Sequence, residues 1–117
     1  MKIAIFSKFN MAGGSEMRCV ELCNGIVRLT DNQAFLLSEK DVSDGVTDRL
    51  DERVIVVKNC FSVPNFIYDA DVIIVVNTDS NDFSTIDYWN GKSFIHGNGI
   101  DVEKLRGKKM FFLYNFI

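Results

Sequence analysis

Residues 72–76 read VIIVV and carry the strongest strand signal in the chain, because five β-branched residues follow one another without a polar interruption. The next five residues, NTDSN at 77–81, have side chains that favour turns, and they end the strand. A run that is continuously apolar, rather than alternating, is typical of a strand buried on both faces of a sheet. We therefore expect residues 72–76 to form a central strand.

Four further apolar runs have the same character and lie at residues 2–6, 34–37, 53–57 and 110–117. A long helical pattern separates the first two runs, and a polar helical stretch at 43–50 separates the second from the third. Continuously apolar strands that alternate with helices predict a parallel sheet covered on both faces. The predicted fold class is α/β, a Rossmann-like three-layer α/β/α sandwich with a mainly parallel sheet.

The long helix is predicted to begin at residue 15, where apolar residues take up a period of 3.6. Ser15 is the expected N-cap, and residues 30–32 supply the stop. The inward stripe is expected to contain Cys19, Leu22, Cys23 and Ile26, and the outward side to contain Arg18, Glu21, Asn24, Gly25 and Arg28.

Length and composition indicate one globular domain, with 117 residues, 47% of them hydrophobic and 25% charged. In the region 83–107 the turn dipeptides Asn90-Gly91 and Asn98-Gly99 favour a short helix followed by a loop or hairpin. The last apolar run reaches residue 117, where a parallel sheet would need another crossover helix. We expect residues 1–117 to be a single domain that forms the N-terminal half of a longer, two-domain protein.

Net charge and cysteine spacing exclude several classes of protein. The net charge of −3 leaves no basic surplus, which argues against a dedicated nucleic-acid binder. Apolar runs are far shorter than a membrane span, and we expect a cytoplasmic protein. Cys19, Cys23 and Cys60 have no metal-ligand spacing, so buried thiols in a reducing compartment are expected and no metal site is predicted.

Two glycines directly precede the long helix. In a doubly wound sheet, ligands bind at the carboxyl ends of the strands near the point where strand order reverses. The free amides and the positive dipole end of a helix that starts there can hold an anion, and Gly13 and Gly14 let a ligand approach the backbone. An ordinary βα loop, with glycines chosen for their backbone angles, remains the alternative.

Other nucleotide and catalytic motifs do not fit the chain. The GxGxxG motif needs a glycine directly after the first strand, where residues 7–9 read SKF. Glu39, after the second strand, stands where dinucleotide-binding folds place a ribose-binding acid, but an isolated glutamate is weak support. His96 is the only histidine and lies in a turn-rich region, so it does not indicate a catalytic base.

The strand at residues 2–6, the loop NMAGGSE at 10–16 and the helix after it together resemble the first βα unit of GT-B glycosyltransferases, the glycogen-synthase-like or group 1 enzymes. The family's GG-small-E signature matches Gly13, Gly14, Ser15 and Glu16. In that family two Rossmann-like domains face each other, and the C-terminal one holds the nucleotide-sugar. The glycine loop of the N-terminal domain closes over the donor's diphosphate and sugar, so the resemblance implies that these four residues bind the donor.

The resemblance extends to residues 69–77, DADVIIVVN, which look like the family's acidic approach to a strand that ends near the acceptor. It implies acceptor-side positions at Asn77, Asp79 and Asn115. Many relatives place a histidine at these strand ends, whereas this chain has Asn77-Thr78 and Tyr114-Asn115 there. No catalytic residue is therefore assigned, and the role is not transferred to His96.

The expected function is that of the N-terminal, acceptor-side domain of a nucleotide-sugar-dependent glycosyltransferase. The whole enzyme would move a sugar from a nucleoside diphosphate donor to an acceptor hydroxyl, with the nucleotide-sugar as co-substrate and no further cofactor. Its partners would be the donor, an unknown acceptor and a C-terminal domain, without which this chain is expected to be inactive; the resemblance allows for peripheral membrane association of the full protein. The alternatives are a freestanding Rossmann-like nucleotide- or anion-binding module, with Glu39 as the discriminating residue, and a structural domain without a ligand.

Overall fold

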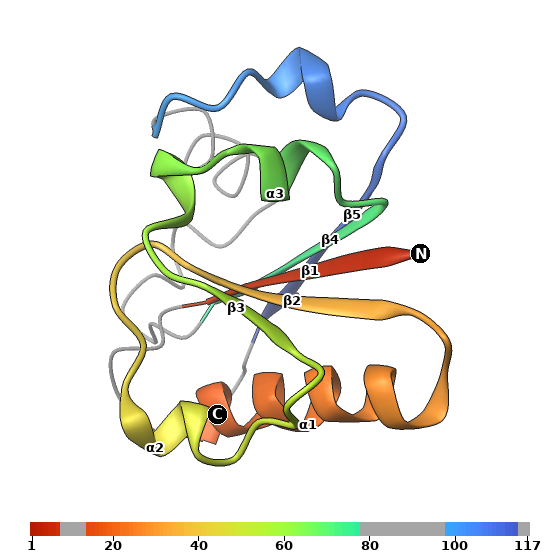
Figure 1. The fold of residues 1–117 in the computed structure, drawn as a ribbon. Coiled ribbons are helices and arrows are strands. Elements are labelled where there is room, and N and C mark those ends of the chain that lie inside the picture. The colour runs from red at the N-terminus through yellow and green to blue at the C-terminus, as the bar shows by residue number, and fades with distance from the viewer. Residues whose placement is uncertain (8–13, 78–97, 115–117) are drawn as a thin grey trace.

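The computed structural model describes residues 1–7, 14–77 and 98–114. They form one five-stranded sheet in the order β3-β2-β1-β4-β5, in which every neighbouring pair is parallel. Figure 1 shows the sheet edge-on between two layers of helices, so the predicted α/β sandwich is confirmed. The elements are β1 (Lys2–Ser7), α1 (Gly14–Leu29), β2 (Gln33–Ser38), α2 (Asp44–Thr47), β3 (Ile55–Val57), η1 (Cys60–Ser62), α3 (Asn65–Tyr68), β4 (Val72–Asn77), η3 (Val102–Leu105) and β5 (Lys109–Tyr114).

The strand order creates a switch point at β1. The chain moves outward from β1 to β2 and β3, then returns across the sheet to β4 on the other side of β1. The helices α1 and α2 cover one face, and α3, η1 and η3 lie on the opposite face (Figure 1). Because right-handed crossovers are the rule in such sheets, reversing the direction of travel also moves the connection to the other face.

The face under α1 is closed by a cluster that joins the helix to the inner strands. Its buried members are Ile5, Cys19, Val20, Cys23, Val27, Ala34, Leu36, Val42, Val46, Val54 and Val76. Burial of each large aliphatic side chain contributes about 1.5–3 kcal/mol. This cluster therefore holds α1 firmly along the sheet.

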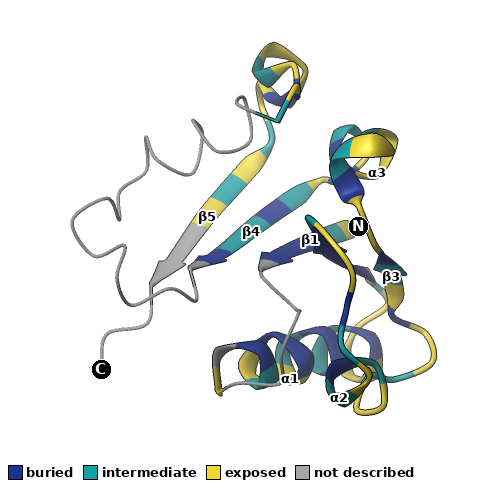
Figure 2. Cartoon of the chain, turned by 90° about the vertical axis from the view of Figure 1, so that its left-hand side faces the viewer, coloured by how far each residue is buried: buried dark blue, intermediate teal, exposed yellow. Residues whose placement is uncertain are grey.

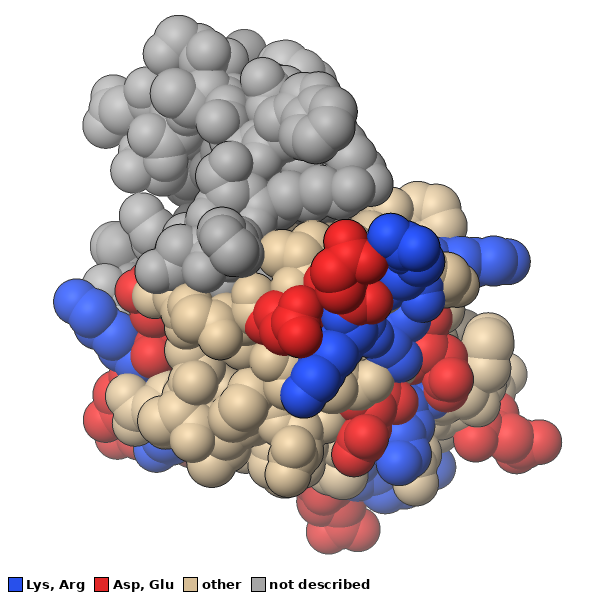
Figure 3. All heavy atoms as spheres, turned by 90° about the horizontal axis from the view of Figure 1, so that it is seen from above, with Lys and Arg blue, Asp and Glu red and all other residues tan. Residues whose placement is uncertain are grey.

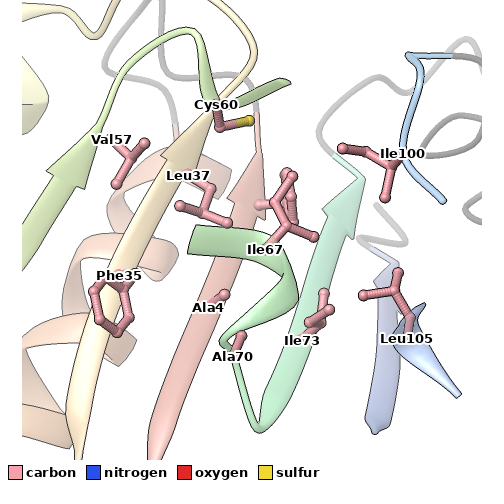
Figure 4. Packing of buried hydrophobic residues seen from close by; sticks show 11 residues of the cluster. Ala4, Phe35, Leu37, Val57, Cys60, Ile67, Ala70, Ile73, Ile100 and Leu105 are labelled. Carbon is pink, nitrogen blue, oxygen red and sulfur yellow. The ribbon is translucent and has the colours of Figure 1, made fainter. Parts of the chain in front are cut away.

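The opposite face is closed by residues from more distant parts of the chain. Figure 4 shows Ile67 of α3 lying above the strands between Leu37 and Ile73, with Ile100 and Leu105 beside β4. The buried members of this cluster are Ala4, Phe6, Phe35, Leu37, Val57, Cys60, Ile67, Ala70, Ile73, Ile100 and Leu105.

The positions of the strands in the sheet agree only in part with those predicted from the sequence. The run at 72–76 is an inner strand, β4, as predicted. The runs at 53–57 and 110–117 are predicted to be buried strands. Val54 and Val57 are buried, but β3 and β5 are the two edge strands of the described sheet, and residues 115–117 lie outside the described residues. Ile55 is 41% exposed and Phe111 is 50% exposed, because an edge strand has a neighbour on one side only.

The helices differ from prediction at three points. The helix α1 begins at Gly14, so Ser15 lies inside the first turn and is not the N-cap. The polar stretch at 43–50 contains only one helical turn, α2. Asn24, expected on the outward side of α1, is buried, because its side chain is hydrogen-bonded to the segment that follows α2.

Acidic and basic side chains are intermixed on the described part of the surface seen from above in Figure 3. In the region 98–107, expected to include a loop or hairpin, the structure has the short helix η3; residues 78–97 lie outside the described part of the chain. Among the described helices, none is long and apolar enough to cross a membrane.

Candidate functional site

The candidate site lies where β1 ends and α1 begins. The end of β1 at Ser7 is level with the end of β2 at Ser38, and Phe6 pairs with Val75 of β4 on the other side. The carboxyl ends of the three central strands therefore meet at one edge of the sheet, which faces the viewer in Figure 2. This is the edge at which doubly wound sheets bind ligands, at the place where strand order reverses.

Gly14 is the first residue of α1 and is exposed. Its φ is not in the left-handed region, unlike those of Gly99 and Gly107, which are both +84°. A Cβ built on Gly14 would meet no atom within 4 Å. Neither a left-handed backbone nor close packing therefore requires a glycine at position 14, whereas Gly13 lies outside the described residues.

Glu16 lies in the first turn of the same helix and is only 6% exposed. It belongs to the stripe of α1 that faces the sheet, which continues through Val20, Cys23 and Val27. It makes no hydrogen bond or ion pair with any residue of the described ranges 1–7, 14–77 and 98–114.

The loop after β2 borders the site on the β3 side and is held by its own contacts. The buried Ser38 hydroxyl donates to the Asp41 carbonyl at 3.3 Å, and the Asn59 amide donates to the Lys40 carbonyl at 3.1 Å. Lys58 lies 2.9 Å from the Asp41 carboxylate, and hydrogen bonding to it holds the pKa of Asp41 below its usual value. Glu39 directly follows β2 in this loop and is half-buried.

The predicted site residues divide into those that the structure describes and those that it does not. Gly14, Ser15 and Glu16 form the first turn of α1, and Asn77 is the last residue of β4, paired in register with Tyr114 of β5. All four positions lie at the carboxyl edge of the sheet. Gly13, Asp79, Asn115 and His96 are outside the described residues.

One feature of the site was missed in the sequence. The predicted inward stripe of α1 started at Cys19, yet the spacing of residues 16, 20, 23 and 27 is also helical and places a carboxylate at the head of the stripe. The position of Glu16 was therefore readable from periodicity, whereas its burial was not.

The cysteines offer no chemistry to the site. All three are buried thiols, as predicted, and none of them forms a disulfide. Burial raises the pKa of Cys23 to about 12, with a smaller effect from Cys19, and burial likewise raises the pKa of Cys60 to about 12. Protonated thiols are poor nucleophiles and poor metal ligands. Within the described residues, no three His, Cys, Asp or Glu side chains gather closely enough to hold a metal ion.

The backbone amides in the first turn of α1 could donate hydrogen bonds to a ligand, with Glu16 in the same turn. Comparison with protein-family models, with curated proteins and with solved structures finds no match to this chain.

Proposed function

We propose that this chain is the N-terminal, acceptor-side domain of a nucleotide-sugar-dependent glycosyltransferase. The observation that supports this most is the position of Gly14, Ser15 and Glu16, the described part of the GGSE sequence, in the first turn of α1 beside the carboxyl end of the central strand. Gly14 is exposed and a Cβ built on it would meet no atom within 4 Å, so its surface is open to a ligand.

In this proposal the chain positions the substrates and stabilises the negative charge that develops on the leaving group. Sugar transfer leaves negative charge on the departing nucleoside diphosphate, and backbone amides at a helix N-terminus stabilise such charge. The first turn of α1 supplies those amides. Asn77, at the end of β4 on the same edge, is the described candidate for the acceptor side, and a second domain would complete the donor site.

The test is a titration of the ¹⁵N-labelled chain, followed by amide chemical shifts, with UDP, UDP-glucose, GDP and GDP-mannose as probes. We expect the amides of Gly14, Ser15 and Glu16 to shift most for at least one nucleotide-sugar. The affinity for half a site is expected to be low, in the range of roughly 1 mM, which corresponds to about −4 kcal/mol.

Two glycine variants sharpen the test. Gly14→Ala should lower the affinity at least fivefold, because the methyl group occupies the space of the ligand. Gly25→Ala, in the middle of the same helix, is the matched control, since a Cβ at either position would meet no atom within 4 Å. Absence of binding for every probe, or equal affinity of Gly14→Ala and the parent chain, would contradict the proposal.

A freestanding nucleotide-binding module is the second candidate, and the position of Glu39 favours it. Glu39 comes one residue after Ser38, which pairs with Ser7 of β1, so its carboxylate follows the strand adjacent to the switch point. Dinucleotide-binding folds use an acid at that place for the ribose hydroxyls. Binding of NAD⁺ that is lost in Glu39→Gln would support this module, whereas a glycosyltransferase domain is indifferent to that change.

A further inference from the structure

An asparagine followed by a glycine occurs three times in the sequence, at residues 24–25, 90–91 and 98–99. In such a pair the backbone nitrogen of the glycine can attack the side-chain carbonyl carbon of the asparagine, because glycine has no side chain to obstruct it. The new N–C bond closes a succinimide ring, and the side-chain nitrogen leaves as ammonia with the amide proton. Water then opens the ring to aspartate or to isoaspartate.

The pair Asn24-Gly25 is protected against this reaction. Both polar atoms of the Asn24 side chain are bonded, since the amide donates to the Arg49 carbonyl at 2.9 Å and the oxygen accepts from the Asp51 amide at 2.7 Å. Gly25 lies inside α1, where its N–H takes part in the hydrogen bonding of the helix. Attack at Asn24 would therefore require α1 to open and its side-chain hydrogen bonds to break.

The pair Asn98-Gly99 lies in a turn that precedes η3. Gly99 is exposed, has a φ of +84°, and would meet no atom within 4 Å if a Cβ were added. Its amide donates no hydrogen bond to any residue that the structure describes. Asn98 is half-buried and has an interaction of its own, so the difference between the two pairs lies in the glycine nitrogen. That nitrogen can attack without the loss of any helix or strand.

We infer that Asn98 is a site of spontaneous deamidation and isoaspartate formation. This inference is independent of the proposed function. The isoaspartate form adds one methylene group to the main chain directly before Ile100, which is 2% exposed and packs beside β4 in the cluster opposite α1 (Figure 4). The next residue, Asp101, is also anchored, because its amide donates to the Tyr68 hydroxyl at 3.0 Å. The longer backbone cannot keep both anchors in place, so the modification destabilises this face of the sheet.

The experiment incubates the full chain at 37 °C and about pH 8, where loss of the amide proton is favoured, and follows each site over several weeks. Trypsin places the two described pairs in separate peptides, residues 19–28 and 93–104, each with a single asparagine. Mass spectrometry measures deamidation of each peptide, and enzymatic methylation of the isoaspartyl carboxylate counts that product. We expect Asn98 to react at least about tenfold faster than Asn24, whose attack first requires local unfolding.

Two variants test the mechanism at this turn. Asn98→Gln should keep the peptide 93–104 unmodified, because the same attack would have to close a six-membered ring. Gly99→Ala should slow the reaction by obstructing the nitrogen, and Asn98→Gln remains informative if a side chain at a φ of +84° disturbs the turn. Gly25→Ala is the matched control, and it should leave the rate at Asn98 unchanged.

Urea unfolding tests the structural consequence. The incubated parent chain should unfold at a lower urea concentration than the fresh chain, in proportion to the isoaspartate at Asn98, whereas incubated Asn98→Gln should keep its midpoint. Equal rates at Asn98 and Asn24 in the native chain would overturn the inference. So would modification confined to the peptide 59–92, which carries Asn90, or reaction at Asn98 only after unfolding in urea.

Discussion

Polar groups at the amino ends of the strands differ in their hydrogen bonding from Glu16 at the carboxyl ends. At the amino edge, the Met1 amino group donates to Asn32 at 2.8 Å, and the Lys2 amide donates to the Asp71 carboxylate at 2.8 Å. The Lys108 ammonium donates to the Ala70 carbonyl on the same edge at 2.6 Å. At the carboxyl ends of the strands, Ser38 is hydrogen-bonded to Asp41 in the same way, whereas Glu16 makes no hydrogen bond with a described residue.

This contrast separates structural polar groups from one that is available to a ligand. The hydrogen bonds of the amino edge join segments that are far apart in the sequence, and they stabilise the fold. Glu16 makes no such bond with a described residue, and natural proteins keep polar groups of that kind mainly at functional sites. If this distinction holds, replacing a bonded polar group should lower the free energy of unfolding, and replacing Glu16 should not.

Asn24 should give the largest effect. It clamps the middle of α1 to residues 49–51, through the Arg49 carbonyl and the Asp51 amide. Asn24→Ala leaves both backbone groups without their partner, and we expect the free energy of unfolding to fall by about 2–3 kcal/mol. Urea denaturation followed by circular dichroism measures the loss.

Glu21→Ala is the control for Asn24, because Glu21 is exposed on the same helix. Its expected change is below about 0.5 kcal/mol. A similar small loss in Asn24→Ala would mean that the clamp contributes little and that burial alone does not mark a structural polar group.

Glu16 should behave in the opposite way. Glu16→Leu replaces a largely buried acidic residue on the sheet-facing stripe by an apolar side chain, and we expect the free energy of unfolding to rise by about 1 kcal/mol. The favourable effect of an acid on the helix dipole reduces this gain. A destabilised Glu16→Leu chain would show that the carboxylate has a structural role, and the contrast between the two edges would then fail.

Asp51 should give the smallest effect, and one that depends on pH. Its carboxylate accepts hydrogen bonds from Arg28 and Arg53, both at 3.0 Å, and these bonds hold the pKa of Asp51 far below its usual value. A lowered pKa means that the carboxylate stabilises the fold above about pH 4 and that this contribution is lost as the pH falls further.

Asp51→Asn should therefore lower stability modestly at neutral pH, and its difference from the parent chain should shrink between about pH 4 and pH 2. The effect is modest because the two arginines are solvent-exposed, and salt should screen it. Thermal unfolding at three pH values, in low and in high salt, measures this. A difference that is independent of pH would show that the charge of Asp51 does not contribute.

The sequence predicts which segments form strands better than it predicts the position of each strand in the sheet. Residues 110–114 are as apolar as residues 72–76, yet one segment is an edge strand and the other is flanked on both sides. Local pattern reports the tendency to form a strand, but the neighbour of a strand is set by pairing over long sequence distances.

At the site, too, the features set by neighbouring residues could be predicted, and those set by distant residues could not. The glycine pair and the acid after it were recognisable as a motif at a strand end, and the fold places Gly14 and Glu16 at the switch point. The clamp at Asn24 was not predictable, because the backbone groups that it binds come from residues 25 and 27 positions further along the chain.

The order of the strands also affects how the chain assembles as it is synthesised. All buried members of the cluster under α1 except Val76 come from the first 54 residues, whereas the cluster on the opposite face extends from Ala4 to Leu105. At roughly 5–20 residues per second, the ribosome needs several seconds to add the remaining segments. Until β4 has been synthesised, β1 can pair with β2 only, and no strand lies along its other backbone edge. A nascent chain of this fold therefore presents an unpaired central strand, so that protection by a chaperone matters most before residue 77 has left the exit tunnel.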